Sequence, residues 1–217
     1  MKRFLLVTSA VALLVSPATA ANFSFTGAFG ADDDVQLFNF SVGAVSTVTL
    51  LTYSYAGGTM ADGTVVAAGG FDPILALFDG AGLFIDNNDD GSFPDVGVDP
   101  VTGDTYDTYF QSTLNPGNYT VAVSQFDNFF LGGIGDPISL GFSEVGNPTF
   151  TGDIWGTPGS MFIDVNGDQR TNQWAFDILN VGTASQTGNP VPEPGTLCLL
   201  GSGLLGLVVY GGYRRRA

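Results

Sequence analysis

The chain has 217 residues with 6 basic and 21 acidic side chains, a formal net charge of −15 at pH 7 and a pI near 4.1. A protein this acidic repels phosphate backbones, which excludes nucleic-acid binding. There is no histidine and one cysteine, Cys198, so Ser-His-Asp and Cys-His catalysis, ordinary zinc sites and an internal disulfide are excluded as well.

The first 20 residues have the three parts of a secretory signal peptide. Lys2 and Arg3 precede an apolar run over residues 4–15, and Ala18 and Ala20 supply the small residues that a signal peptidase accepts. We therefore expect export across the inner membrane and cleavage after Ala20. The folded domain is then predicted to span residues 21–181, enough chain to bury a substantial core.

Residues 21–181 show short β-type runs separated by Gly, Asp, Asn and Pro, and no convincing amphipathic helix. Strands are predicted over residues 22–29, 35–42, 45–55, 74–78, 83–86, 106–114, 118–125, 138–143, 159–165 and 172–181. The Asn166-Gly167 dipeptide predicts a tight hairpin, and the Gly-rich stretches 56–70 and 127–137 predict surface loops. The pattern favours an all-β fold, a single antiparallel β-sandwich of jelly-roll type, with barrel closure as the alternative.

Five segments follow one another in a recognisable order. They are an acidic run with a strand (32–40), a second strand (45–53), an Asp-Pro segment (71–79), an Asn-Asp-Asp-Gly loop (85–91) and a Pro-Gly turn with a strand (114–123). This succession resembles the bacterial pre-peptidase C-terminal domain. The resemblance implies a β-sandwich without a catalytic role, found on secreted enzymes and surface proteins. It ends near residue 125, so additional elements are expected after it.

The densest acidic segment predicts a calcium loop. Asp86, Asn88 and Asp90 have the spacing of loop positions 1, 3 and 5, and Gly91 follows them. Position 12 is Gly97, which rules out an EF-hand, so the site would need backbone oxygens or more distant carboxylates such as Asp72 or Asp95. The alternative is a solvated turn, because Asn, Asp and Gly also favour turns.

Two smaller acidic groups have the same two interpretations, a shared cation or a solvated turn. They are the run Asp32, Asp33, Asp34 and the alternating set Asp164, Asn166, Asp168. For both groups the turn is the favoured interpretation.

Aromatic residues indicate where a sugar would bind if the domain recognises one, although core packing is the default for most of them. The candidates include Trp155, Trp174, Tyr53, Tyr55, Tyr106 and Tyr109. Phe126, Phe129 and Phe130 are expected to be difficult to bury together and predict a contact patch. Paired carboxylates would suffice for glycoside hydrolysis, but the sequence marks no pair, so no catalytic residue is assigned.

The C-terminal region has the parts of a sorting signal. A predicted linker at residues 182–191 leads to Pro192, Glu193 and Pro194, an apolar run at 195–213 and three arginines at 214–216. The run is long enough for one transmembrane helix, and the arginines would stay in the cytoplasm. This tripartite segment, 192–217, resembles the PEP-CTERM sorting signal of Gram-negative bacteria; an ordinary membrane anchor is the alternative. The resemblance implies an exosortase as partner, transient anchoring in the membrane, and release or attachment at the cell surface.

These observations predict a non-enzymatic protein of the cell surface or extracellular matrix. A structural component of an exopolysaccharide or biofilm matrix, stabilised by calcium, is the leading hypothesis. A calcium-dependent, lectin-like carbohydrate-binding module is the alternative, and an uncharacterised glycoside hydrolase comes last.

Overall fold

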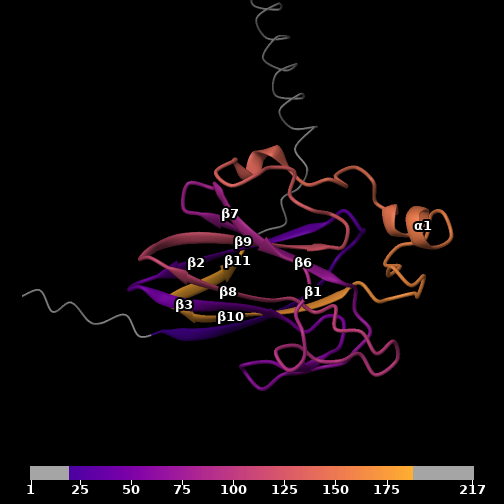
Figure 1. Ribbon diagram of the computed structural model, residues 1–217, viewed down its shortest axis with the longest axis horizontal. Helices are drawn as coiled ribbons and strands as arrows, with labels where there is room; N and C mark the ends of the chain where they lie inside the picture. Colours follow the sequence, from indigo (N-terminus) through magenta and orange to yellow (C-terminus); the bar gives the residue numbers. More distant parts are fainter. Residues whose placement is uncertain (1–19, 188–217) are drawn as a thin grey trace, which may run out of the picture.

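The domain is built from two antiparallel sheets that pack face to face (Figure 1). The computed structural model describes residues 20–187. In the order of their pairing, the first sheet contains β1 (Ala21–Ala28), β10 (Gln173–Val181), β3 (Ser46–Thr52) and β8 (Tyr109–Leu114). The second contains β11 (Thr183–Gln186), β2 (Val35–Val42), β9 (Gly117–Gln125), β6 (Pro73–Asp79) and β7 (Phe84–Asn88). A small hairpin, β4 (Gly58–Thr59) with β5 (Val65–Val66), lies outside both sheets. The predicted all-β sandwich is confirmed, and the two main sheets formed by residues 20–187 are open and not closed into a barrel.

Strands β6 and β9 are buried on both faces. Leu75, Leu77, Val121 and Val123 point into the main core between the sheets, and all four are fully buried. The residues between them belong to a second cluster on the outer face, which contains Val35, Ala76, Phe78, Phe84, Ala122 and Phe142. Phe130, Ile138 and Phe142, from the chain after β9, pack in this cluster and cover the outer face.

Eight of the ten predicted strands are confirmed, with boundaries that differ by a few residues. The strand predicted at 138–143 is wrong, because Ile138–Leu140 forms a 3₁₀ turn between Pro137 and Gly141, whose φ is 82°. The strand predicted at 159–165 is also wrong. There, Phe162 N–H donates to Asp32 Oδ1 at 2.7 Å and Ile163 N–H donates to Thr151 Oγ1 at 3.0 Å. Side chains take the hydrogen bonds that a neighbouring strand would need.

Three elements lie in segments predicted as loop, linker or non-helical chain. The short helix α1 (Phe150–Trp155) has only six residues, too few to show a periodic pattern. The β4–β5 hairpin lies in the predicted loop 56–70. Strand β11 lies in the predicted linker 182–191 and pairs with β2, so the folded domain extends past residue 181. The Asn166-Gly167 hairpin is confirmed by a 3.0 Å hydrogen bond from Asp164 N–H to Asp168 O.

The predicted signal peptide and the predicted sorting signal lie outside the described residues, apart from Ala20. Within residues 20–187, no helix has the length and apolar character needed to cross a membrane.

Candidate metal site

Three carboxylates meet at one edge of the second sheet. Asp72 directly precedes β6, and Asp89 and Asp90 directly follow β7. Because β6 and β7 are antiparallel, with Leu75 opposite Asn88, the start of one strand lies beside the end of the other. One carboxylate oxygen from each residue lies within 4.8 Å of the other two, a separation that a shared cation can bridge.

Local contacts hold the backbone of this corner. The Thr108 hydroxyl lies between the backbone carbonyls of Pro73 and Asp89 and can donate its one proton to either, so it links the β6 side to the β7 side. Gly91 N–H donates to Asp107 O at 2.8 Å. A Cβ atom on Gly91 would lie 2.5 Å from Val96 Cγ1, which is too close for any other residue. Glycine is therefore required here by close packing.

The three carboxylates of the site differ in their exposure to solvent. Asp72 is 5% exposed, Asp89 is half-buried and Asp90 is exposed. Oδ1 of Asp72 and Oδ1 of Asp89 are buried without a hydrogen-bond partner in residues 20–187. Arg170 is the only basic residue in that range, and its guanidinium is paired with Asp99. Burying an ionised carboxylate without a partner is costly, so the protein alone leaves these groups uncompensated.

The pKa values of the three carboxyls reflect this environment. Burial, followed by the charges of Asp89 and Asp90, raises the pKa of Asp72 well above 3.8. Burial raises the pKa of Asp89 to about 7, with further contributions from the charges of Asp90 and Asp127. The pKa of Asp90 is also raised, by burial and then by neighbouring carboxylates. A bound cation would reverse these shifts, because it favours the ionised form.

The donor set fits a hard divalent cation. Calcium takes six to eight oxygen ligands at about 2.3–2.6 Å, and carboxylates can bind it through one oxygen or two. Asp72, Asp89 and Asp90 would supply three to six of these oxygens by that rule. The remaining positions would face the solvent on the Asp90 side.

Two of the five residues predicted as calcium ligands, Asp72 and Asp90, lie in this cluster. Asp86 and Asn88 lie on β7, where alternate residues are about 6.6 Å apart, so the extended backbone keeps them from converging as in a loop. Asp86 Oδ1 accepts from Asn87 N–H, and the Asn88 amide donates to Tyr109 O at 2.7 Å. Asp95 is exposed and lies outside the three-carboxylate group.

Asp89 was absent from the predicted set because its loop position falls between the alternating ligands. Its signal in the sequence is its neighbour Asp90, since two consecutive carboxylates after a strand need solvent or a cation to reduce their repulsion.

The smaller acidic groups are explained by hydrogen bonds within the protein. Asp32 is fully buried and accepts from the backbone N–H groups of Thr151 and Phe162. Asp164 accepts from Asn166 N–H, Asp168 N–H and the Tyr55 hydroxyl. Asp164 organises the predicted hairpin, but Asp32 and Asp164 are both buried, so the solvated turns favoured by the sequence are wrong in that respect: protein groups take the place of solvent.

The three phenylalanines of the predicted contact patch separate in the structure. Phe130 packs in the outer-face cluster against Phe78 and Phe84. Phe126 stacks on Trp155, with ring centroids 5.6 Å apart and planes at 19°, and Phe129 meets Phe126 edge-on. Trp174 is 3% exposed and belongs to the main core.

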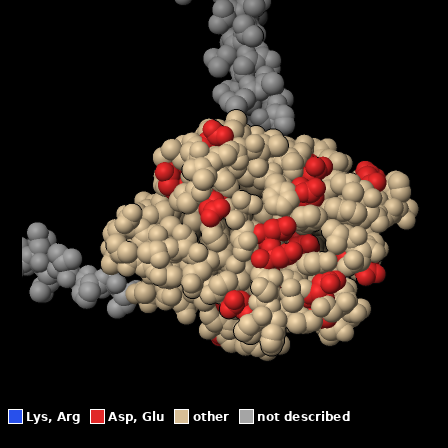
Figure 2. Space-filling view, in the orientation of Figure 1, with Lys and Arg blue, Asp and Glu red and all other residues tan. Residues whose placement is uncertain are grey.

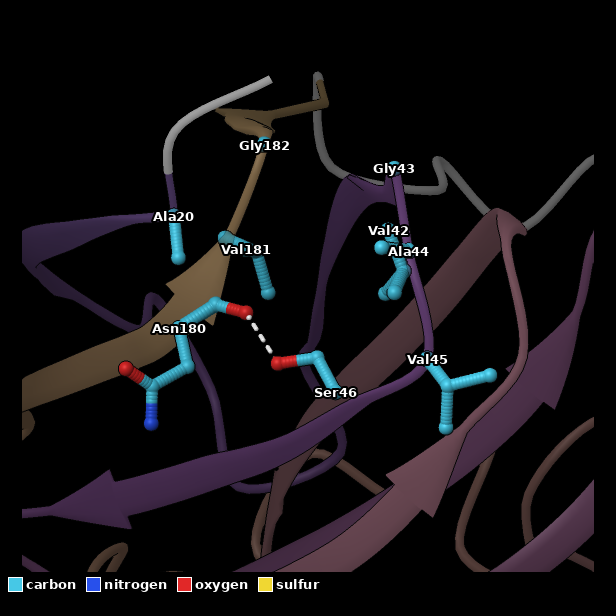
Figure 3. A pocket seen from close by; sticks show the side chains of 9 residues that line it. All are labelled: Ala20, Val42, Gly43, Ala44, Val45, Ser46, Asn180, Val181 and Gly182. Carbon is cyan, nitrogen blue, oxygen red and sulfur yellow. Dashed lines mark hydrogen bonds between the residues drawn. The ribbon is translucent and has the colours of Figure 1, made fainter. Parts of the chain in front are cut away.

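A hollow at the opposite end of the sandwich carries no comparable chemistry. It is lined by small, apolar or uncharged residues, namely Ala20, Val42, Gly43, Ala44, Val45, Ser46, Asn180, Val181 and Gly182 (Figure 3). Ser46 Oγ donates to Asn180 O at 3.0 Å across it. Because Ala20 forms part of its wall, the predicted cleavage after Ala20 would open the hollow further.

Comparison with known proteins identifies the C-terminal segment. The model of the PEP-CTERM protein-sorting motif matches residues 190–216, which include Pro192, Glu193 and Pro194. No curated protein matches the chain. The predicted sorting signal is therefore confirmed, and the motif implies export, processing by an exosortase and a cell-surface or extracellular destination. The resemblance to the pre-peptidase C-terminal domain is supported only at the level of the β-sandwich fold.

Proposed function

We propose that this protein is a non-enzymatic component of an extracellular polysaccharide matrix, and that calcium bound by Asp72, Asp89 and Asp90 stabilises its β-sandwich. The sorting motif supports the destination of the protein. The acidic surface supports a role among cations and hydrated polymers, because it disfavours partners of the same charge. Figure 2 shows several groups of acidic side chains on the face in view, with no basic side chain among the described residues of that face.

The observation that carries the calcium proposal is the environment of Asp72. Its side chain is almost fully buried, Oδ1 has no hydrogen-bond partner in residues 20–187, and two further carboxylates lie within 4.8 Å. A group in this position is either protonated or neutralised by a cation. In an extracellular protein, where calcium is abundant, we infer that the cation is calcium.

The proposal also includes the remaining predicted ligands and the two predicted terminal segments. Asp86, Asn88 and Asp95 remain predicted ligands, which would act only if the end of β7 and the loop after it rearranged. A signal peptide at residues 1–20 and a transmembrane helix at residues 195–213 remain the predicted route to the exosortase.

A thermal melt of the full-length chain in detergent, with excess calcium or with chelator, tests the proposal. A ligand that binds only the folded state adds about 2.7 kcal/mol at 100 times its dissociation constant, which shifts the midpoint by several degrees. We expect this shift in the unmodified protein and its loss in Asp89→Asn.

Asp168→Asn is the matched control. It removes the same charge from an exposed turn residue outside the cluster, so it should keep the calcium shift. Equal melting curves in calcium and chelator for the unmodified protein would contradict the proposal. Loss of the shift in Asp86→Asn, with the shift kept in Asp89→Asn, would instead support the predicted loop.

A further inference from the structure

We propose that the metal corner and the neighbouring Phe126–Trp155 pair form one binding site for a neutral sugar. Two adjacent hydroxyl groups of the sugar would bind the calcium ion, and the face of its ring would contact Trp155. This inference rests on the proposed calcium site and assigns the site a class of ligand.

The metal site is closed on one side and open on the other. Asp72 approaches from the interior, whereas Asp90 is exposed, so the protein carboxylates surround an ion from the inner side. Calcium needs six to eight oxygens, and the outer positions are left for water or for oxygens of a ligand. Adjacent hydroxyls of a pyranose are two neutral oxygens held close together, which suits two neighbouring positions on the ion.

The aromatic pair neighbours the metal corner on its β9 side, next to Asp72, through the β6–β9 pairing. Gln125 pairs with Pro73, and one residue further Phe126 N–H donates to Asp72 O at 2.9 Å. Residues directly opposite each other on antiparallel strands project to the same face, with Cβ atoms about 5 Å apart. The next residue, Asp127, lies close enough for its charge to contribute to the raised pKa of Asp89.

Trp155 lies next to Phe126, and a hydrogen bond to the buried Asp32 carboxylate holds the helix that carries Trp155. Its ring stacks on Phe126, and both side chains are half-buried, so part of the pair stays in contact with solvent. Trp155 is the last residue of α1, and the buried carboxylate of Asp32 fixes the start of that helix through Thr151. A large aromatic face on a fixed backbone binds an apolar sugar face at low entropic cost.

Electrostatics selects a neutral sugar over an acidic one. Three carboxylates around a divalent ion already exceed its charge when they are ionised, and Asp127 adds another negative group nearby. The only basic side chain in residues 20–187 is the buried Arg170. A uronate would therefore bring an additional negative charge with no cationic partner on the protein, which disfavours it.

The test measures retention of the full-length chain, in a detergent without a sugar head group, on immobilised polymers. The neutral probes are galactomannan, dextran and xyloglucan, and the acidic probe is polygalacturonate. We expect retention on at least one neutral polymer in calcium, and at least tenfold weaker binding in chelator. Trp155→Ala should weaken binding by at least tenfold yet keep the calcium-dependent melting shift.

Val65→Ala is the control, because Val65 is 78% exposed and lies on the β4–β5 hairpin, away from the metal corner in the sheet order, so this variant should bind like the unmodified protein. A calcium-dependent melting shift without retention on any neutral polymer would overturn the sugar site while leaving the calcium site intact. Unchanged binding by Trp155→Ala, or stronger retention on polygalacturonate than on every neutral polymer, would overturn it as well. Absence of the melting shift itself would refute the calcium proposal on which the sugar site rests.

Discussion

Arg170 and Asp99 form an ion pair of 2.8 Å in which both side chains are almost fully buried. The guanidinium also donates to Tyr55 O at 2.9 Å and to Gly70 O at 3.0 Å, and its carbon lies 3.8 Å from the centre of the Tyr55 ring. Burial opposes ionisation of Asp99, but hydrogen bonds from Arg170, Thr102 and Val101 outweigh it and lower the pKa of this carboxyl. The single basic residue of the described domain therefore joins three loops at one point.

Replacing Arg170 with methionine should destabilise the domain by about 3–5 kcal/mol, because it leaves the Asp99 carboxylate buried without a partner. Urea unfolding, followed by tryptophan fluorescence, measures the change. The double variant Arg170→Met/Asp99→Asn should recover part of the loss, since the remaining partner then carries no charge. Additive losses in the double variant would argue that the pair is not coupled.

In chelator, the domain should become less stable as the pH rises from 5 to 8. Burial raises the pKa of Asp72, Asp89 and Asp107 above the ordinary value of 3.8, and that of Asp89 reaches about 7. Between pH 3.8 and the raised pKa of each group, the folded state holds more protons than the unfolded state. The free energy of unfolding therefore falls as the pH rises through this range. The loss continues through about pH 7, where Asp89 ionises in the folded protein.

Excess calcium should flatten this pH dependence, because the ion stabilises the ionised carboxylates. Urea midpoints at pH 5, 6, 7 and 8, in chelator and in calcium, provide the comparison. A midpoint in chelator that rises steadily over this range would contradict the prediction.

The sheets were predictable from the sequence because their strands carry period-two patterns that survive in three dimensions. Residues 119–124 alternate clearly, and in the structure Val121 and Val123 point into the main core. The segments 138–143 and 159–165 have similar composition, but their backbone hydrogen bonds go to loops and to the buried side chain of Asp32. Hydrogen bonds to partners far away in the sequence produce no recognisable pattern of residues within the segment itself.

The candidate site was predictable only in part for a related reason. Acidic residues in 86–91 indicated a cation, whereas the identity of its ligands depends on the antiparallel pairing of β6 with β7. That pairing brings Asp72 to Asp89 and Asp90, and the extended conformation of β7 separates Asp86 from them. The spacing of the acidic residues along the sequence is typical of a calcium loop. In the structure, however, residues 86–88 of that predicted loop belong to strand β7.

The boundary of the folded domain can be tested at β11. Ala184 is opposite Phe40 and packs against the main core, although it lies in the predicted linker. Ala184→Asp should cost about 1–3 kcal/mol, because it places a charge against apolar side chains. Ser185→Asp adds the same charge at an exposed neighbouring position and should change the urea midpoint little. Equal changes in the urea midpoint for the two variants would indicate that residues 182–187 belong to the linker and not to the folded domain.

The sorting motif makes a prediction about processing in cells. Replacing Pro192, Glu193 and Pro194 with alanine should leave the C-terminal apolar run on the protein, because the matched motif at residues 190–216 would no longer be intact. Mass spectrometry of the cell-associated and released protein should then find the larger product, in the membrane fraction. Replacing Gly188 and Asn189 with alanine changes two residues upstream of the matched motif and should leave the mass of the processed product unaffected, apart from the substitutions themselves. A triple-alanine variant with the same mature mass and location as the unmodified chain would show that the Pro-Glu-Pro segment is not read and would contradict the exosortase assignment.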